Sequence, residues 1–195
     1  MMNKELYFLR HGATALQGLY VGSTDVPLAE EGRKQVVQAR EVLVDKGIEL
    51  IYCSPMKRCR ETLNLLHLDA PCEIDENLRE IDFGRWEGCS FSEITQTDST
   101  LVEDWRINSE SFCFPEGECV QDFNKRVNLF GKKVEAAPEN RILILSHGGT
   151  IRQLLCTFLG LSPEKRMIFD IQAGTVSSMT LYGDIGVLKS LNMKR

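Results

Sequence analysis

The sequence predicts an α/β fold in which helices cover both faces of a mostly parallel central sheet, as a three-layer sandwich. Short apolar runs, typical of buried parallel strands, alternate along the chain with stretches of helical periodicity. Charged or titratable residues follow several of these runs, where ligands of such sheets bind. The length of 195 residues suffices for one domain with a sizeable core, and we expect a single domain over 1–195.

The first half of the chain contains two predicted pairs of strand and helix. "ELYFL" at 5–9 and "ELIYC" at 49–53 are apolar runs of strand length. A helix is expected after the first strand over 30–46, where it opens with "AEEG". Another is expected after the second strand over 55–66, with Ser54 as its N-cap and the next residue, a proline, in the first helical position.

The second half repeats the alternation around one irregular segment. "CEI" at 72–74 and "RILILS" at 141–146 are the remaining predicted strands, and a helix is expected over 149–160. Apolar residues recur every three or four positions over 117–136, which predicts a helix packed on the sheet. The stretch 81–116 follows neither period and holds both tryptophans, so we expect an inserted lid segment there.

Composition and charge argue against several classes of function. The chain is 43% hydrophobic and 26% charged, and its formal net charge of -5 argues against a nucleic-acid partner. No apolar run has the length of a secretory or membrane-spanning segment, so we expect no membrane partner and a cytoplasmic location. The pattern specifies no oligomeric state. We expect the seven cysteines, which form no CxxC pair, to be reduced and mostly buried; they stand at 53, 59, 72, 89, 113, 119 and 156.

Four separate segments bring charged or titratable side chains to one edge of the predicted sheet. Arg10 and His11 follow the first strand, and Arg58 lies in the first turn of the helix after the second. Glu80 comes shortly after the third strand, and His147 directly follows the fourth. Because the carboxyl ends of parallel strands meet at the same edge, we expect these five side chains to surround one crevice.

Each of these residues alone has a simpler structural interpretation. A lone histidine at a strand end is commonly a structural residue, Arg58 fits a solvated helix face, and Glu80 is one acid among several. Two of the three histidines occupy matching strand ends, however, which favours a shared site. His67, at the end of a helix, needs no chemical role. In "SHGGT", Gly148 allows the backbone to approach a ligand closely.

Two arginines, two histidines and a glutamate suit the transfer of a phosphoryl group without a metal or other cofactor. Guanidinium groups match phosphate oxygens and stay charged, so Arg10 and Arg58 are candidates for holding the substrate. A neutral imidazole can attack phosphorus, which makes His11 the candidate nucleophile and His147 a candidate donor to the phosphoryl oxygens. Glu80, beside a phosphate dianion, can keep a proton for the leaving alkoxide and then act as base for water.

These motifs together resemble the histidine phosphatase superfamily, in its phosphoglycerate mutase-like branch. The likeness covers most of the chain and rests on four ordered boxes, "RHG", "SPMKRCRET", "LREIDFGRWEG" and "SHGG". It implies a phosphohistidine at His11, with Arg10, Arg58 and His147 as phosphate ligands and Glu80 as proton donor. The partner that it implies is a small-molecule phosphate ester.

The chain departs from the family's pattern directly after the first box. Where "RHGETxxN" is usual, this chain has "RHGATALQ", so Ala13 replaces the acid and Gln17 stands at a phosphate-contacting position. Gln17 can still donate from its longer arm. The loss of the acid puts in doubt only the orientation of neighbouring groups.

Several functions remain open within this resemblance. "EIDFGRWEG" is similar to the phosphatases of the superfamily, which favours a phosphomonoesterase of a small or sugar phosphate over a phosphoglycerate mutase. A phosphate-binding module without catalysis is disfavoured, because every catalytic position is filled. "GLYVGSTDVPL" and "FPEGE" are similar to members that act on a benzimidazole nucleoside phosphate. Trp86, Trp105 and Phe112 could stack on such a base or form the core of the lid segment.

Overall fold

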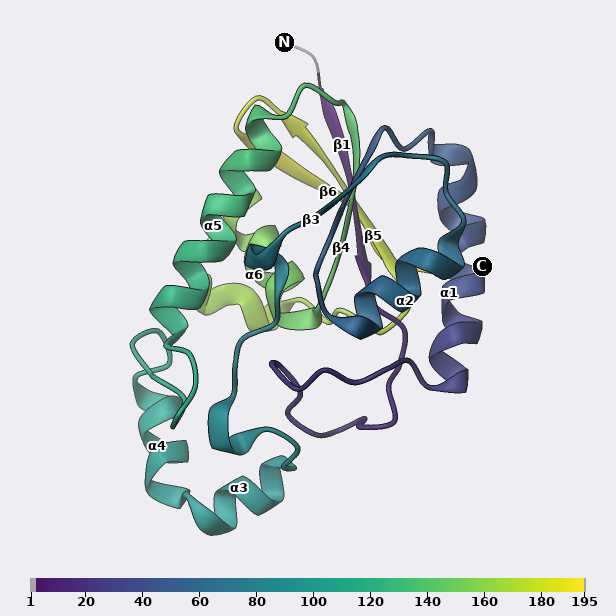
Figure 1. Cartoon of the computed structure of the whole chain (residues 1–195). Helices are drawn as coiled ribbons and strands as arrows, with labels where there is room; N and C mark the ends of the chain where they lie inside the picture. Colours follow the sequence, from purple (N-terminus) through teal and green to yellow (C-terminus); the bar gives the residue numbers. More distant parts are fainter. Residues whose placement is uncertain (1–2, 195) are drawn as a thin grey trace.

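The computed structural model describes residues 3–194 and shows a six-stranded mixed sheet between two layers of helices (Figure 1). The strands are β1 (Lys4–Arg10), β2 (Leu50–Cys53), β3 (Cys72–Ile74), β4 (Arg141–Ser146), β5 (Val176–Tyr182) and β6 (Ile185–Met193). Their order is β3-β2-β4-β1-β5-β6. The first four run parallel, and β5 runs antiparallel to both β1 and β6. The predicted α/β class is therefore confirmed.

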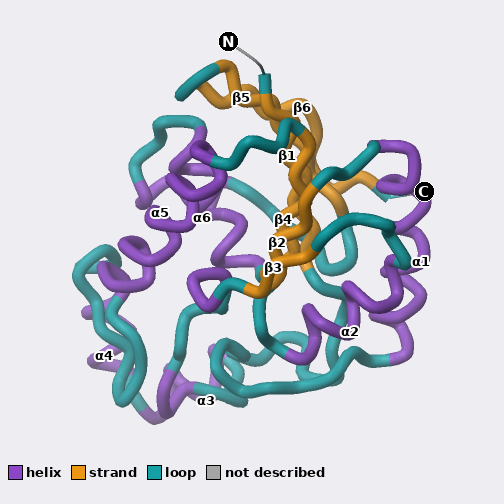
Figure 2. Tube along the Cα trace, turned by 45° about the horizontal axis from the view of Figure 1, so that its top comes forward, coloured by secondary structure: helices purple, strands orange, loops and turns teal. Residues whose placement is uncertain are grey.

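Helices cover both faces of the sheet, as Figure 2 shows. They are α1 (Glu30–Leu43), α2 (Lys57–Leu66), α3 (Phe91–Thr97), α4 (Ser99–Ile107), α5 (Val120–Ala136) and α6 (Gly148–Phe158), with 3₁₀ helices at Val44–Lys46, Glu76–Leu78, Gly84–Trp86 and Pro163–Ile168. In β1, Leu6 and Phe8 pack with α5 and α6, whereas Tyr7 and Leu9 pack with α1 and α2. Because both faces are buried, the strand is apolar at consecutive positions rather than alternating ones.

The predicted elements are present with boundaries that differ by a few residues, and one predicted cap is wrong. The helix expected from 55 begins at Lys57, and Met56 occupies its N-cap position. Ser54 is not the cap, because its hydroxyl oxygen lies 2.8 Å from Nε2 of His147 and serves the site described below. His67 ends α2 as its C-cap with a left-handed backbone, φ 47°.

Two strands, β5 and β6, were not predicted. β5 carries two adjacent serines, Ser177 and Ser178, and so lacks an unbroken apolar run. β6 is an edge strand whose residues are half-buried or exposed. Neither pattern differs clearly from that of a loop. Pairing of β5 with β1, and of β6 with β5, decides their conformation.

The segment expected as a lid, 81–116, carries α3 and α4 and extends beyond the end of α5, away from the sheet (Figure 1). Aromatic rings form its core. Trp86 stacks on Phe112 with ring centroids 5.7 Å apart, and Trp105 meets Phe114 edge to face at 5.3 Å. Trp86 is 1% exposed and Phe112 3%, so neither can stack on a substrate.

The expectation that every cysteine is reduced is wrong. Cys113 and Cys119 form a disulfide and pair as an antiparallel bridge. Their spacing and the odd number of cysteines gave no indication of this pairing. It depends on a turn in which Phe114 N–H donates to Glu118 O and Gly117 N–H donates to Phe114 O. The other five cysteines are free thiols, of which three are buried.

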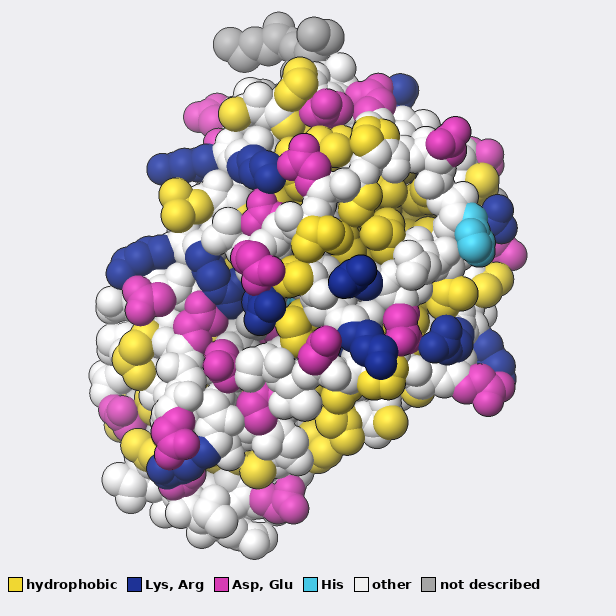
Figure 3. All heavy atoms as spheres, in the orientation of Figure 1, with side chains coloured by type: hydrophobic (Ala, Val, Ile, Leu, Met, Phe, Trp, Pro, Cys, Tyr) yellow, Lys and Arg dark blue, Asp and Glu magenta, His cyan; other side chains and the backbone are white. Residues whose placement is uncertain are grey.

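The surface is consistent with the charge balance of the sequence. On the face drawn in Figure 3, Lys and Arg side chains lie among Asp and Glu side chains and form no continuous basic field. Within residues 3–194, no helix has both the length and the apolar composition needed to cross a membrane.

Removing the disulfide should lower the stability of the fold. In a Cys113→Ser/Cys119→Ser double variant, we expect the free energy of unfolding to fall by about 2 kcal/mol, because the opened chain regains entropy when unfolded. Urea denaturation of the variant, and of the wild type with and without dithiothreitol, measures the effect. Identical midpoints for the oxidised and reduced wild type would contradict a disulfide that stabilises the fold.

Candidate active site

The register of the parallel strands brings the ends of β1 and β4 level with each other. Arg10 pairs with Ser146, and the N–H of His11 donates to the carbonyl oxygen of Ser146 at 3.0 Å. The rings of His11 and His147 consequently lie edge to face, with centroids 5.1 Å apart. Two residues from distant parts of the sequence thus become neighbours.

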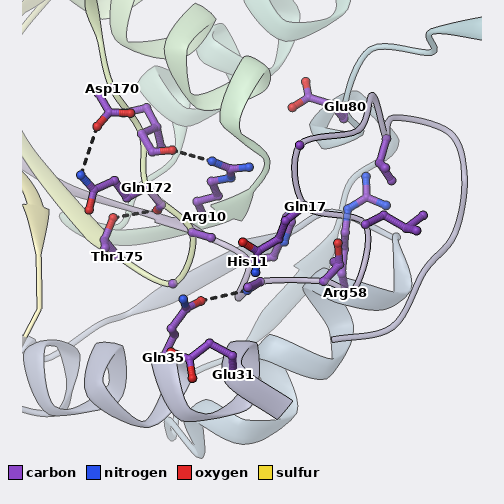
Figure 4. Close-up of a pocket in the computed structure, with 18 of the residues that line it drawn as sticks. Arg10, His11, Gln17, Glu31, Gln35, Arg58, Glu80, Asp170, Gln172 and Thr175 are labelled. Atoms are coloured by element: carbon purple, nitrogen blue, oxygen red, sulfur yellow. Dashed lines mark hydrogen bonds between the residues drawn. The ribbon is translucent and has the colours of Figure 1, made fainter. Parts of the chain in front are cut away.

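A cavity of about 510 Å³ lies at this edge of the sheet. Five residues predicted for the site line it, as Figure 4 shows: Arg10, His11, Gln17, Arg58 and Glu80. The other two, His147 and Gly148, are buried and do not line it. A Cβ on Gly148 would lie 3.4 Å from Nε of Arg10, so this glycine gives the guanidinium room.

The protonation of His11 follows from its contacts. Nδ1 lies 2.8 Å from the carbonyl oxygen of Gly12, which can only accept, so Nδ1 carries the proton and Nε2 the lone pair. Burial lowers the pKa of His11 to about 3, and the charges of Arg10 and Arg58 act in the same direction. The ring is therefore a neutral imidazole at neutral pH, with Nε2 able to act as a nucleophile.

The guanidinium group of Arg10 is held by the protein at Nη1 and not at its buried Nε. Its Nη1 donates to the carbonyl oxygen of Ile171 at 2.7 Å, while its buried Nε has no partner within residues 3–194. Burial lowers the pKa of Arg10, and the nearby charge of Glu80 opposes that shift. A buried donor without a partner is costly, and an oxygen of a bound anion would satisfy it.

Arg58, at the start of α2, is 1% exposed and has only neutral partners. Nη1 donates to Thr24 O at 2.9 Å and Nη2 to Gly22 O at 2.8 Å. Nε donates to Nδ1 of His147 at 3.1 Å. Since guanidinium nitrogens only donate, Nδ1 of His147 is an acceptor, and its Nε2 carries the proton that Ser54 Oγ accepts.

Both ring nitrogens of His147 are thus bound to protein groups. Burial holds the pKa of His147 well below its usual value, and the charge of Arg58 lowers it further. The residue orients Arg58 in this structure. Its expected role as a direct donor to phosphate stays a prediction.

Glu87, which was not among the residues predicted for the site, holds the loop that supports Arg58. Oε1 accepts from the N–H groups of Gly22 and Ser23, both at 2.9 Å, and Oε2 accepts from Thr24 N–H at 3.1 Å. The carbonyl groups of this loop therefore face Arg58 in a defined arrangement. The signal was present in the sequence, because Glu87 is the acid of "GRWEG" in the third family box.

Glu80 lies against the N-terminus of α6. Its Oε2 accepts from Gly149 N–H at 2.8 Å, and its Oε1 from its neighbour Ile81 N–H at 3.2 Å. A Cβ on residue 149 would come within 2.4 Å of Oε1, so a side chain there would displace this carboxyl group. The N-terminus of α6 therefore holds the carboxyl group of Glu80 in a defined position at the wall of the cavity.

A second cleft, of about 270 Å³, shares Glu80 with the first cavity. Its walls are mainly apolar and include the aromatic residues Tyr20, Phe83 and Trp105. Tyr20 meets Phe83 edge to face, with centroids 5.0 Å apart. Of the three aromatic residues suggested by the sequence as stacking partners, only Trp105 lines this cleft.

The remaining polar contacts of the site involve no recognisable metal ligands. Within residues 3–194, no group of three or more His, Cys, Asp or Glu side chains could hold a metal ion. Ala13, where the family usually has an acid, is buried, and its N–H donates to Gln35 Oε1 at 2.9 Å. Gln17 lines the first cavity from an exposed position.

Comparisons with known proteins show similarity to phosphatases over nearly the whole chain. A relative from Hydrogenobacter thermophilus, named for phosphoserine phosphatase activity, is 29% identical over 97% of this chain and 95% of its own. The adenosylcobalamin/alpha-ribazole phosphatase of Escherichia coli K12 is 28% identical over 97% of this chain and 96% of its own. The crystal structure of the alpha-ribazole phosphatase from Shigella flexneri superposes with a TM-score of 0.87, at 29% identity over 97% of this chain and 96% of that chain.

The family assignment rests on nearly the whole chain. The profile of the histidine phosphatase superfamily, branch 1, matches residues 6–194. That range begins in β1, includes both histidines of the site and extends past β6. The chain therefore belongs to the histidine phosphatase superfamily (branch 1).

Proposed function

We propose that this chain is a metal-independent phosphomonoesterase that works through a phosphohistidine on His11. The state of His11 carries the proposal. Its imidazole is neutral, Nδ1–H is held by Gly12 O, and Nε2 has no hydrogen-bond partner within residues 3–194. Arg10 and Glu80 line the same cavity, so a cation and a proton donor lie beside the nucleophile.

The reaction proceeds in two displacements. Nε2 of His11 attacks phosphorus in line, the bond from phosphorus to the ester oxygen breaks, and Glu80 gives its proton to the leaving alkoxide. Water then enters on the same side, Glu80 removes its proton, and the bond between phosphorus and nitrogen breaks to release phosphate. The free His11 and the protonated Glu80 are restored.

The phosphate contacts follow from the charges in the cavity. Arg10 offers its Nε, which has no partner among residues 3–194, and Arg58 contributes a positive charge whose hydrogen-bond partners in the same range are neutral. His147 is retained as a proposed donor through Nε2–H after release from Ser54. Gln17 and the backbone of Gly148 are the remaining proposed contacts.

The aromatic cleft supports a proposal for the class of alcohol. The leaving oxygen must lie near Glu80, and the cleft shares that residue with the phosphate cavity. A flat base can stack against Trp105 and Tyr20 there. Relatives named alpha-ribazole phosphatase support the same choice. We therefore propose alpha-ribazole 5'-phosphate as substrate, with alpha-ribazole and phosphate as products, in assembly of the cobalamin nucleotide loop.

One observation favours a second candidate, a small phosphate ester that carries a carboxylate. Arg152 lines the cleft, and it uses Nε on Phe169 O at 2.8 Å. Both of its Nη groups lack a hydrogen-bond partner within residues 3–194 and could bind an anionic group of the alcohol. Phosphoserine, the substrate in the name of one relative, has such a group.

We also propose that the enzyme is located in the cytoplasm, because five of its seven cysteines are free thiols, as is usual in reducing compartments. The Cys113–Cys119 disulfide is the opposing observation, because disulfides are rare in such compartments. Recovery of the chain from an extracytoplasmic cell fraction would contradict this location.

The first prediction of the proposal concerns the intermediate. Quenching the enzyme during turnover of a ³²P-labelled ester should trap label that is stable to alkali and labile to acid, and His11→Ala should trap none. Turnover should continue in EDTA, because protein side chains supply the positive charge. Label on serine or aspartate, or an absolute requirement for Mg²⁺, would contradict the mechanism.

The second prediction follows from the two neutral histidines. Burial lowers the pKa of His11 to about 3 and that of His147 well below 6.5, so below about pH 6.5 the unfolded state binds protons that the folded state does not. Stability should therefore fall as pH drops from about 7 to about 5.5, by about 1 kcal/mol for each histidine. Urea denaturation measures this, and the His11→Gln variant should show about half the dependence. The same dependence in His11→Gln as in wild type would exclude His11 as a source.

The third prediction tests the substrate. Alpha-ribazole 5'-phosphate should be hydrolysed with a higher kcat/KM than phosphoserine, 3-phosphoglycerate or glycerol 3-phosphate. Trp105→Ala should lower that kcat/KM by about tenfold to a hundredfold, the usual range for a lost stacking contact, and leave glycerol 3-phosphate nearly unaffected. Phe91→Ala, on exposed surface of α3, is the matched control. Faster hydrolysis of phosphoserine would instead favour the second candidate.

A further inference from the structure

The segment that carries Glu80 lacks a strand partner. It follows the 3₁₀ helix Glu76–Leu78 and has no place in the sheet ladder. Buried carbonyl groups outside regular structure need other donors. In this segment, side chains from three other elements supply them. Ser146 Oγ donates to Leu78 O at 2.7 Å, and Thr150 Oγ1 donates to Arg79 O at 2.9 Å.

Arg126, from the middle of α5, makes the largest contribution. Its Nη1 donates to Asn77 O at 2.9 Å and to Arg79 O at 2.8 Å. Its Nη2 donates to Glu80 O at 3.0 Å. One rigid guanidinium group thus binds three carbonyl oxygens within the four residues 77–80, which end at the acid. A lysine ammonium, a point donor, could not span them in the same way.

The other side of Arg126 is fixed by an acid next to the disulfide. Glu118 accepts from Nε at 2.7 Å and from Nη2 at 2.8 Å, and both side chains are about four-fifths buried. Glu118 directly precedes Cys119, which is tied to Cys113. A bidentate ion pair of this burial orients the guanidinium strongly. The carbonyl contacts of Arg126 therefore depend on Glu118, next to the disulfide, as well as on α5.

We infer that Arg126 is a positioning residue that sets the location of Glu80 for proton transfer to the leaving group. Arg126 lines neither the phosphate cavity nor the aromatic cleft, so it acts through Glu80 and not on the substrate. This inference rests on the proposed role of Glu80 as general acid. The contacts of Arg10 and His11 with the phosphoryl group do not involve Arg126.

The position of an acid matters most for leaving groups that need a proton. A misplacement of 1 Å can cost about a hundredfold in rate. Arg126→Gln should therefore lower kcat on glycerol 3-phosphate by at least about tenfold, with KM nearly unchanged. On p-nitrophenyl phosphate, whose phenolate leaves without a proton, kcat should change by less than about threefold. Arg126→Lys, which keeps the charge but not the fork, should show the same division between the two substrates.

Two further variants make the test decisive. Lys125→Gln, the adjacent exposed residue of α5 with its own ion pair to Asp122, should behave as wild type. Glu80→Gln should show the same substrate dependence as Arg126→Gln, and adding Arg126→Gln to it should cause no further loss on glycerol 3-phosphate.

The outcomes separate this inference from the proposed function. Equal losses on both esters in Arg126→Gln, or losses that add in the double variant, would overturn the positioning role while leaving Glu80 as the acid. A Glu80→Gln variant with equal losses on both esters would overturn the acid itself and this inference with it. Retained hydrolysis of p-nitrophenyl phosphate by Arg126→Gln shows that the phosphate cavity is still folded, which excludes general unfolding as the cause.

Discussion

The site depends on a buried arginine, Arg58, and a half-buried one, Arg10, whose hydrogen-bond partners are neutral. Arg58 gives its donors to two carbonyl oxygens and an imidazole, and Arg10 gives one to a carbonyl oxygen. Burying a cation is costly unless its hydrogen bonds are satisfied, yet a carboxylate partner would cancel the charge that attracts a phosphate. Neutral acceptors satisfy the hydrogen bonds of the guanidinium groups without cancelling their positive charge. The same positive charges, together with burial, keep His11 and His147 neutral, which a nucleophilic imidazole requires.

This arrangement requires accurate support from outside the cavity, and the 81–118 region provides much of it. Glu87 binds three successive N–H groups of the loop whose carbonyl oxygens receive Arg58. Glu118 orients Arg126, which holds the segment leading to Glu80. The 81–118 region therefore connects the phosphate side of the site with the proton-donor side. In both connections, one charged side chain forms hydrogen bonds with several backbone groups. Such a set of bonds holds a loop more firmly than a single hydrogen bond would.

The packing of the lid segment also divides the site into a polar cavity and an aromatic cleft. Trp86 and Phe112 form the core of the lid segment, and their packing leaves Trp105 at the wall of the cleft. Glu80 stands where the two spaces meet. A carboxyl group at that junction can reach the one oxygen that joins phosphorus to the alcohol. Binding energy from the alcohol can then contribute to orienting the phosphate.

The sequence by itself determined the parallel part of the sheet, the helices on its two faces, and the edge where Arg10, His11, Arg58 and Glu80 meet. These features are recorded locally, because a strand buried on both faces must be apolar throughout and a helix on a sheet must carry an apolar stripe. The four sequence motifs that resemble the family's pattern pointed to the same site residues.

Only the tertiary structure decided which groups those residues contact. The roles of Ser54, Glu87 and Arg126, the disulfide and the orientation of His147 toward Arg58 join segments that lie far apart in the chain or meet at an irregular turn. β5 and β6 likewise take their conformation from pairing next to β1. Such contacts leave no periodic pattern, since each depends on one donor meeting one acceptor once the fold has formed.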